Sequence, residues 1–498
     1  MHLAQCRTIS FLMVAVVAIL IAFGLSAGAQ FTGDDWHFLV LLRNIDSPWD
    51  ALTSNVGGSY YYRPFVLVLF WLTTVAFGVD PLPHYVLNVA LHCWVAFEVF
   101  AFVRGLTNKH ACAAWAGLLF LVLPLTAATP LWISDRFDLV ATGAMLLSLR
   151  LMTRWAAASD ANHWPLYGAA VAGLLAYGSK ETAFALLPAQ LMLIALFRAR
   201  AMAARRMAAV AVALSCGAAL ACRYFALDGW TGRVSPPMNF DTMFSGVTRW
   251  FQSLPTALQT HDGGIVLCVL GTLAICSFMF RQRVYRISAP TTLPTVNILT
   301  TLLIAVLGAV AAQSSVAAII LPHDGAPLAT ATLRLFYTPS AFAFIGVGVF
   351  VSRIGFLGIY RHLASAVGLS AVLFCAAGSA AQTHSWVAAS LLQAIQALPA
   401  VREYAQKASE ALASSAPCTV HLSAQSTPHT DIDLRFKATL SPTDPRLNCV
   451  VVTVPPQVNQ ITRISECAMS SVAPLRSAIT DLQPMVRSGT CTFFFLID

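Results

Sequence analysis

Long apolar runs recur along this chain, and they constrain its fold more than any other feature. Hydrophobic residues make up 57% of the 498 residues and charged residues only 10%, whereas about a quarter of residues are charged in a typical soluble protein. A run of about 20 apolar residues can cross a bilayer as a helix. The sequence therefore predicts a polytopic α-helical membrane protein with about eleven transmembrane helices, near residues 9–27, 84–103, 110–128, 131–149, 164–179, 183–197, 207–226, 263–280, 295–321, 335–352 and 363–380.

The first of these runs allows a second interpretation. Arg7 precedes it and Ala27-Gly28-Ala29 resembles a cleavage site, so a signal peptide is the alternative. An uncleaved first helix is the simpler account, because the run is long enough to span and many further runs follow it.

The distribution of arginines predicts the orientation. A further apolar segment, near residues 64–78, is too short to cross comfortably. If it lies at the interface or is re-entrant, the arginine-rich turns all fall on the side of the N-terminus, which is the positive-inside pattern. We therefore expect a cytoplasmic N-terminus and a transmembrane domain over residues 1–380 with its first outer loop at 28–83. The net charge of +8 then fixes orientation and indicates no nucleic-acid partner.

The composition changes at about residue 381. Helical spacing over 386–413, followed by alternating segments at 449–454 and 491–496, predicts a small α/β domain over residues 381–498. We place this domain outside the cytoplasm. An oxidising compartment would allow its cysteines to pair in three connectivities, and their spacing lacks the CxxC pattern of a zinc site; they are Cys418, Cys449, Cys467 and Cys491.

An acidic pair directly follows the first apolar run. Asp34 and Asp35 lie among aromatic residues of the first outer loop. Acids near a bilayer are costly and usually bind a cation, move a proton or hold a substrate. Aromatic rings and carboxylates together suit a sugar, whereas the aromatic residues alone could form an interfacial belt.

Further polar groups lie on the same predicted face. His84, Asn88 and His92 recur at intervals of four and so share one face of a helix, where they either bind substrate or hydrogen bond to neighbouring helices. Arginine suits a phosphate, which its guanidinium binds through two parallel hydrogen bonds. Charged residues also cluster in the short outer turns, where Arg136 could simply pair with its neighbouring acids; these residues are Arg63, Asp135, Arg136, Asp138, Lys180, Glu181 and Arg334.

In these motifs and their order, residues 1–380 resemble the GT-C type membrane glycosyltransferases. The most similar pattern is that of the transmembrane O-mannosyltransferases that carry tetratricopeptide repeats, although the tail here shows no 34-residue repeat. The matching positions are Asp34-Asp35, Arg63-Pro64, His84 through Asn88 to His92, Trp132 to Asp138, Lys180-Glu181, and Arg334 with Tyr337, Pro339 and Ser340.

The resemblance implies a hexosyltransferase of a bacterial inner membrane that uses a polyprenyl-phosphate-linked sugar. Asp34 or Asp35 would act as general base on an acceptor hydroxyl and invert the anomeric carbon. Arg334 and Lys180 would hold the departing phosphate, and the acceptor would be a lipid, a glycan or a protein. The remaining substrate-binding residues would be Arg63, His84, Asn88, His92, Asp135, Arg136, Asp138, Glu181 and Tyr337. No metal site is predicted, although a divalent cation is left open because metal dependence varies across the class.

Two other function classes fit parts of the sequence. A secondary transporter would use buried acids such as Glu98, but transporters commonly contain an internal repeat, which this sequence does not show. A polysaccharide polymerase or ligase would place its active groups in a large late loop, here residues 227–262.

Overall fold

The protein is helical in a computed structural model, in which two short strands are the other regular elements of the described residues. The structure describes residues 2–29, 31, 35, 38, 42, 45–53, 61–78, 80–157, 162–196, 201–227, 229, 240–259, 302–307, 310, 330–353, 369–390, 418–420 and 491–493.

The described elements follow the predicted apolar runs closely. In chain order they are α1 (His2–Phe23), η1 (Gly24–Gly28), α3 (Pro48–Thr53), α4 (Pro64–Phe77), α5 (Pro81–Thr107), α6 (His110–Val122), α7 (Pro124–Leu131), η4 (Ile133–Asp135), α8 (Arg136–Ala157), α9 (Trp164–Tyr177), η5 (Glu181–Ala185), α10 (Leu186–Leu196), α11 (Met202–Leu227), α12 (Phe240–Gln259), η6 (Thr330–Phe336), α16 (Tyr337–Arg353), a helix over 369–390, β1 (Cys418–Val420) and β2 (Cys491–Phe493).

Several of these helices have the length and apolar composition of a membrane span. Among the described residues α5 and α11 meet both criteria, and α6 with α7 forms a third candidate as one broken span. The helix α4 has 14 residues, or about 21 Å at about 1.5 Å per residue, so the prediction of a short helix here is confirmed. The chain is thus a helical membrane protein, while the count of about eleven spans stays a prediction.

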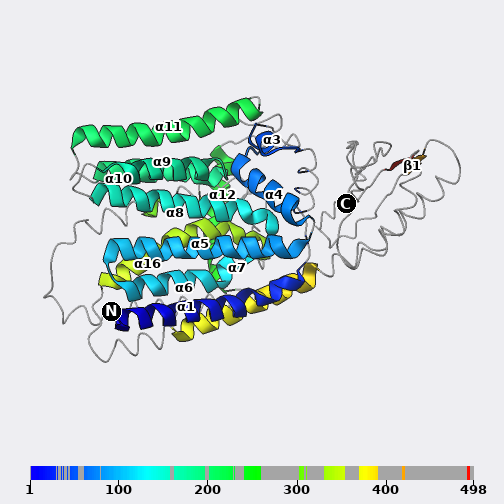
Figure 1. Ribbon diagram of the computed structural model, residues 1–498, viewed down its shortest axis with the longest axis horizontal. Helices are drawn as coiled ribbons and strands as arrows, with labels where there is room; N and C mark the ends of the chain where they lie inside the picture. Colours follow the sequence, from blue (N-terminus) through cyan, green and yellow to red (C-terminus); the bar gives the residue numbers. More distant parts are fainter. Residues whose placement is uncertain are drawn as a thin grey trace. The chain divides into compact units, whose positions relative to one another are not determined.

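The chain divides into two compact units, and each is described by itself. Unit 1 comprises Met1–Leu25, Ala51–Val68 and Val86–Thr383, and unit 2 the remainder. Within unit 1, α9 lies between α11 and α8, and both α8 and α6 pack against α5 (Figure 1). The helix α8 therefore lies at the centre of the bundle. It begins at Arg136, whereas the sequence predicts a start at residue 131.

The predicted span at 110–128 is bent at Leu123. The helices α6 and α7 meet there at 58°, and Pro124 starts α7 because proline cannot continue the preceding helix. A helix end leaves its last carbonyls without helical partners. Here side chains supply the donors: Thr126 Oγ1 to the Phe120 and Leu123 oxygens (3.0 and 2.9 Å), His92 Nε2 to the Leu121 oxygen (2.9 Å), and Ser379 Oγ to the Val122 oxygen (2.8 Å).

A helix also occupies part of the segment that a polymerase or ligase would use as a loop. The helix α12 carries Trp250, whose Nε1 donates to the Leu335 carbonyl oxygen at 3.2 Å, and the Trp250 ring packs on Phe336. Both contacts fall on η6, so α12 fixes the short segment that carries Arg334.

Small residues allow the helices of unit 1 to approach closely, and Gly348 is one position where a larger side chain would not fit. A Cβ atom at Gly348 would lie 2.9 Å from both γ-carbons of Val103 and 3.0 Å from Ala116 Cβ. We expect Gly348→Ala to destabilise the protein by about 1–3 kcal/mol, because overpacking forces backbone shifts. Thermal unfolding in detergent measures this. The matched control is Gly217→Ala in α11, where nothing lies within 4 Å of the added atom, and equal Tm values for the two variants would contradict the prediction.

Unit 2 contains part of the predicted outer loop and the two strands. Trp71 Nε1 donates to the Ile45 carbonyl oxygen at 2.9 Å, and Asp50 Oδ2 accepts from the backbone and hydroxyl of Ser47 at the start of α3. The strands β1 and β2 pair in parallel, and β2 lies within the predicted strand at 491–496. The other predicted strand, at 449–454, lies outside the described residues.

The helix over 369–390 runs through residue 381, where the sequence predicts a change of character. Its first part is anchored in unit 1, since Thr383 Oγ1 donates to the Ala22 carbonyl oxygen at 2.6 Å. The division into domains at this point, and the α/β nature of the tail, stay predictions. Of the four tail cysteines, the structure describes only the backbone of Cys418 and Cys491.

Candidate functional site

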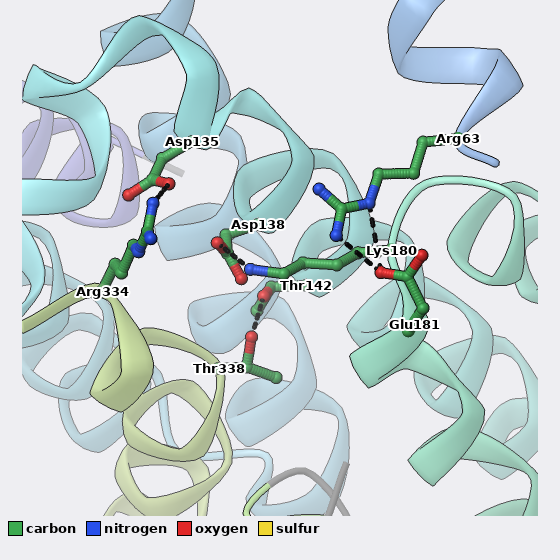
Figure 2. Close-up of polar contacts among 8 residues, drawn as sticks. All are labelled: Arg63, Asp135, Asp138, Thr142, Lys180, Glu181, Arg334 and Thr338. Atoms are coloured by element: carbon green, nitrogen blue, oxygen red, sulfur yellow. Dashed lines mark hydrogen bonds and ion pairs between the residues drawn. The ribbon is translucent and has the colours of Figure 1, made fainter. Parts of the chain in front are cut away.

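Charged side chains from five segments of unit 1 meet at one end of its helices. The site uses the residue before α4, the starts of α8 and α16 with the preceding η4 and η6, the segment between α9 and α10, and the last turns of α11. Figure 2 shows six of these charged side chains in one cluster. The sequence places these segments on one face of the membrane, and within unit 1 the structure brings them together.

Lys180 and Asp138 form the centre of the cluster. The Lys180 ammonium donates to Asp138 Oδ2, while Asp138 Oδ1 is buried and has no hydrogen-bond partner among the described residues. One turn further along α8, the Thr142 hydroxyl shares a hydrogen bond of 2.7 Å with Thr338 of α16. The two helices are therefore joined directly beneath the charged pair.

Arg334 and Asp135 form the second pair. Arg334 Nη1 donates to Asp135 Oδ1 at 3.1 Å, and the guanidinium lies over the Trp132 ring at 4.3 Å. Burial raises the pKa of Asp135 to about 7, because desolvation of the carboxylate outweighs the opposing effect of Arg334. The carboxyl therefore titrates near neutral pH, and its hold on Arg334 varies with pH.

Glu181 joins two arginines from distant segments. Arg63 Nε and Nη2 donate to Glu181 Oε2 at 3.1 and 2.7 Å, and Arg223 Nη1 donates to Oε1 at 2.9 Å. Burial alone would raise the pKa of Glu181, but the two guanidinium groups outweigh it and hold that pKa at about 2. Glu181 is thus a carboxylate at every pH of interest, and we call these three residues the arginine clamp.

The polar stripe on α5 has a structural part that the sequence could not assign. Arg136 Nε donates to Asn88 Oδ1 at 2.9 Å, and Asn88 Nδ2 donates to the Trp132 carbonyl oxygen at 3.0 Å. His92 Nε2 donates to a carbonyl oxygen at the α6–α7 bend, so its Nδ1 accepts a hydrogen bond from the Tyr337 hydroxyl at 2.7 Å. Asn88 and His92 therefore bond to neighbouring segments, which is the second of the two roles expected for them.

The remaining predicted site residues lie in unit 2 or outside the described residues. His84 Nε2 bonds to the Gly78 carbonyl oxygen at 3.2 Å, and the ring contacts Phe31 edge to face. Asp35 is buried, at 1% exposure, and lies close enough to Tyr85 to interact with it electrostatically. Asp34 is not among the described residues. The meeting of either acid with Arg334 stays a prediction.

The chemistry available in unit 1 is anion binding. No group of three or more His, Cys, Asp or Glu side chains among the described residues could hold a metal ion. Among the described residues of this cluster, four cations form ion pairs with three carboxylates; the cations are Arg63, Lys180, Arg223 and Arg334. Sequence reasoning missed Arg223. Its position at the outer end of the predicted span 207–226 could have identified it, because the positive-inside rule disfavours an arginine on that side of the membrane.

The fold and the cluster define a helical membrane protein with a group of paired cations and carboxylates at one end of its helices. No protein-family model matches the chain. Over 108 residues the chain is 32% identical to the protein O-mannosyl-transferase Tmtc1 of Drosophila melanogaster, a match that covers 22% of this chain and 12% of the relative's length. The resemblance to transmembrane O-mannosyltransferases that the motif order predicts is confirmed over this stretch.

Two solved structures are also similar, at low identity. Both are of ArnT from Cupriavidus metallidurans, one bound to undecaprenyl phosphate and one in the apo state, with 16% and 15% identity and TM-scores of 0.42 and 0.41. Each comparison covers 84% of this chain and 82% of ArnT. Scores below 0.5 do not establish a common fold.

Proposed function

We propose that this protein is a membrane glycosyltransferase that moves a sugar from a polyprenyl-phosphate donor to an acceptor on the outer face of the membrane. The observation that carries the proposal is the cluster of four cations at one end of the unit 1 helices. Cations gathered in a low-dielectric setting favour an anionic ligand, and the resemblance to O-mannosyltransferases supplies the reaction class.

Within this proposal the donor phosphate lies between Lys180 and Arg334. Each of these cations is held by its own aspartate, so both are oriented before the donor arrives and stabilise the negative charge that develops on the leaving phosphate. Asp138 Oδ1 and Asp135 Oδ2 accept no hydrogen bond from the described residues, and in this proposal they accept hydrogen bonds from sugar hydroxyls.

Asp34 or Asp35 completes the proposed reaction. The carboxylate takes the proton of the acceptor hydroxyl while the hydroxyl oxygen attacks the anomeric carbon. The new glycosidic bond forms as the bond between that carbon and the phosphate oxygen breaks, which inverts the configuration. The phosphate leaves as an anion on the polyprenyl lipid and needs no proton.

The test of this function is transfer in membrane vesicles. Vesicles from cells that express the chain and from cells that lack it receive a panel of radiolabelled undecaprenyl-phosphate sugars, and label is counted in the lipid, glycan and protein fractions. Incorporation from one donor only when the chain is present is the expected result and identifies both sugar and acceptor class. Equal label in both preparations for every donor would refute the proposal.

A transporter gains no support from Glu98, its candidate proton site. Arg150 Nε and Nη2 donate to the two oxygens of Glu98 at 2.7 and 3.0 Å. This buried ion pair between α5 and α8 accounts for the acid without a proton-transfer role.

Donor binding should depend on pH through Asp135. The folded pKa of about 7 lies above the ordinary value of 3.8, so the carboxyl takes up a proton as pH falls below about 7 and releases Arg334. Between about pH 8 and about pH 6 the protonated fraction rises about tenfold, and the affinity for undecaprenyl phosphate should rise by up to that factor.

Asp135→Asn is the control, because it removes this titration and leaves only that of the phosphate itself. The pH profiles of wild type and variant, measured by tryptophan fluorescence titration, should differ. Parallel profiles would show that Asp135 does not control the binding.

The predicted orientation of the chain in the membrane can be tested with reporter fusions. A reporter enzyme that is active only outside the cytoplasm, fused after residue 390 where the last described helix ends, should be active. The matched control is a fusion in the turn between α5 and α6, at Asn108, which should be inactive. The reverse pair of signals would overturn the orientation predicted from the arginines.

A further inference from the structure

The helix α12 has three sides of different chemistry. Its protein-facing side carries Trp250 and Ser253, which are each 4% exposed. A second side carries Phe244 and Phe251, which are 64% and 47% exposed and lie together because they are two helical turns apart. A helix with an exposed apolar side next to a polar side is typical of a segment that lies in a membrane interface. The polar side of α12 consists of Ser245, Thr248, Arg249 and Gln252.

The composition of α12 does not suit a helix that crosses the bilayer. It has 20 residues, which is long enough to span, yet among the described helices it is α5 and α11, with α6 and α7 as one broken span, that are also apolar enough. A crossing α12 would place its polar side in hydrocarbon, where polar groups are costly. Along the boundary between lipid and water, both exposed sides of α12 meet a suitable medium.

The contacts of α12 place it at the end of the bundle that carries the charged cluster. Trp250 donates to the Leu335 carbonyl oxygen at 3.2 Å and packs on Phe336, and these residues adjoin Arg334. In the same cluster (Figure 2), Glu181 accepts from Arg223 in the last turns of α11. α11 has 26 residues, or about 39 Å at about 1.5 Å per residue, whereas the hydrocarbon core is about 30 Å thick. The end of α11, and with it α12, therefore lies at the membrane surface.

The surface of α11 shows which medium lies beside it at this level. Val210 and Leu214 are 56% and 67% exposed, as expected of lipid-facing positions in a span. Tyr224 and Phe225, in the last turns, are 42% and 80% exposed, and exposed aromatic residues at the end of a span are typical of the interface with lipid. The exposed phenylalanines of α12 continue this interfacial level.

We propose that α12 is a membrane-docking helix, which lies in the bilayer interface at the cluster end of unit 1 with Phe244 and Phe251 inserted between the acyl chains of the lipids. Its polar side is in contact with water. Because Trp250 joins the same helix to η6, docking anchors the segment that carries Arg334 at the membrane surface. The docking does not rest on the proposed function.

Photocrosslinking in the full-length protein tests the docking. Phe244→p-benzoylphenylalanine and Phe251→p-benzoylphenylalanine keep an aromatic ring at exposed positions, so both variants should fold. Each is irradiated in phosphatidylcholine nanodiscs, and its adducts are identified by mass spectrometry. We expect phosphatidylcholine adducts, attached through an acyl chain, at both positions. Leu214→p-benzoylphenylalanine is the reference for a lipid-facing position of α11.

Gln252→p-benzoylphenylalanine is the matched control, because Gln252 is exposed on the same helix but belongs to its polar side. It should give lipid adducts at least about fivefold less often than the two phenylalanine positions. Equal lipid labelling at Gln252 and at the phenylalanine positions would overturn the proposal. Adducts to a second copy of the chain, or to another segment of the same chain, in place of lipid would also overturn it.

The crosslinking is read without a sugar donor and without sugar transfer. Failure of the vesicle assay would therefore refute the proposed function and leave the docking of α12 intact, and absence of lipid adducts would refute the docking alone.

Discussion

Asparagine at position 34 or 35 is expected to reduce sugar transfer by about 10²- to 10⁴-fold, the usual contribution of a general base. Asparagine has nearly the shape of aspartate but cannot accept the acceptor's proton. Asp35 is buried in unit 2 beside Tyr85. Its carboxyl group is therefore shielded from water, as the acids of active sites commonly are. The larger loss identifies the base.

The measurement is label transfer by vesicles that contain equal amounts of each variant, with the donor that the panel identifies. Asp46→Asn is the matched control, because Asp46 is an exposed acid of the same predicted loop, and it should transfer at the wild-type rate. Undiminished transfer in both Asp34→Asn and Asp35→Asn would remove the catalytic role from this pair.

Glu98→Gln is expected to destabilise the protein by about 3–5 kcal/mol, the cost of leaving one charge of a buried ion pair without its partner. The side chains of Glu98 and Arg150 are 3% and 11% exposed, and the pair joins α5 to α8 through two hydrogen bonds. After the substitution the buried Arg150 guanidinium keeps its charge but faces a neutral amide.

Thermal unfolding in detergent tests this, together with the double variant Glu98→Leu/Arg150→Met. Replacing both partners by apolar residues removes the uncompensated charge, so the double variant should recover most of the stability. A single variant as stable as wild type would mean that the ion pair is not what holds α5 and α8 together at this point.

The sequence predicts the meeting of the outer turns but not the pairs that form there. Arg136 is adjacent to Asp135 and close to Asp138, so pairing among these neighbours is one interpretation of the sequence. Helix neighbours two positions apart do not face each other, and in the fold Asp138 pairs with Lys180, Asp135 with Arg334, and Arg136 Nε bonds to Asn88. Such partners depend on the rotation of each helix, which hydrophobic patterning does not fix in an apolar bundle.

The bend at Leu123 could not be located from the sequence for a related reason. Pro124 and Pro130 indicate an interruption in the run at 110–128. Its direction, however, depends on donors that arrive from α5 and from the helix over 369–390. Arg223 is a comparable case, since it belongs to no motif and becomes part of the site only because α11 ends beside Glu181.

That bend also bears on how the protein is assembled during synthesis. Four carbonyl groups at the end of α6 are satisfied by Thr126, His92 and Ser379, and an unsatisfied carbonyl is costly in lipid. Ser379 is translated more than 250 residues after Val122. The early helices of a nascent chain therefore enter the bilayer with one acceptor still unmet, and the interior of this bundle is completed only when its last described helix has been inserted.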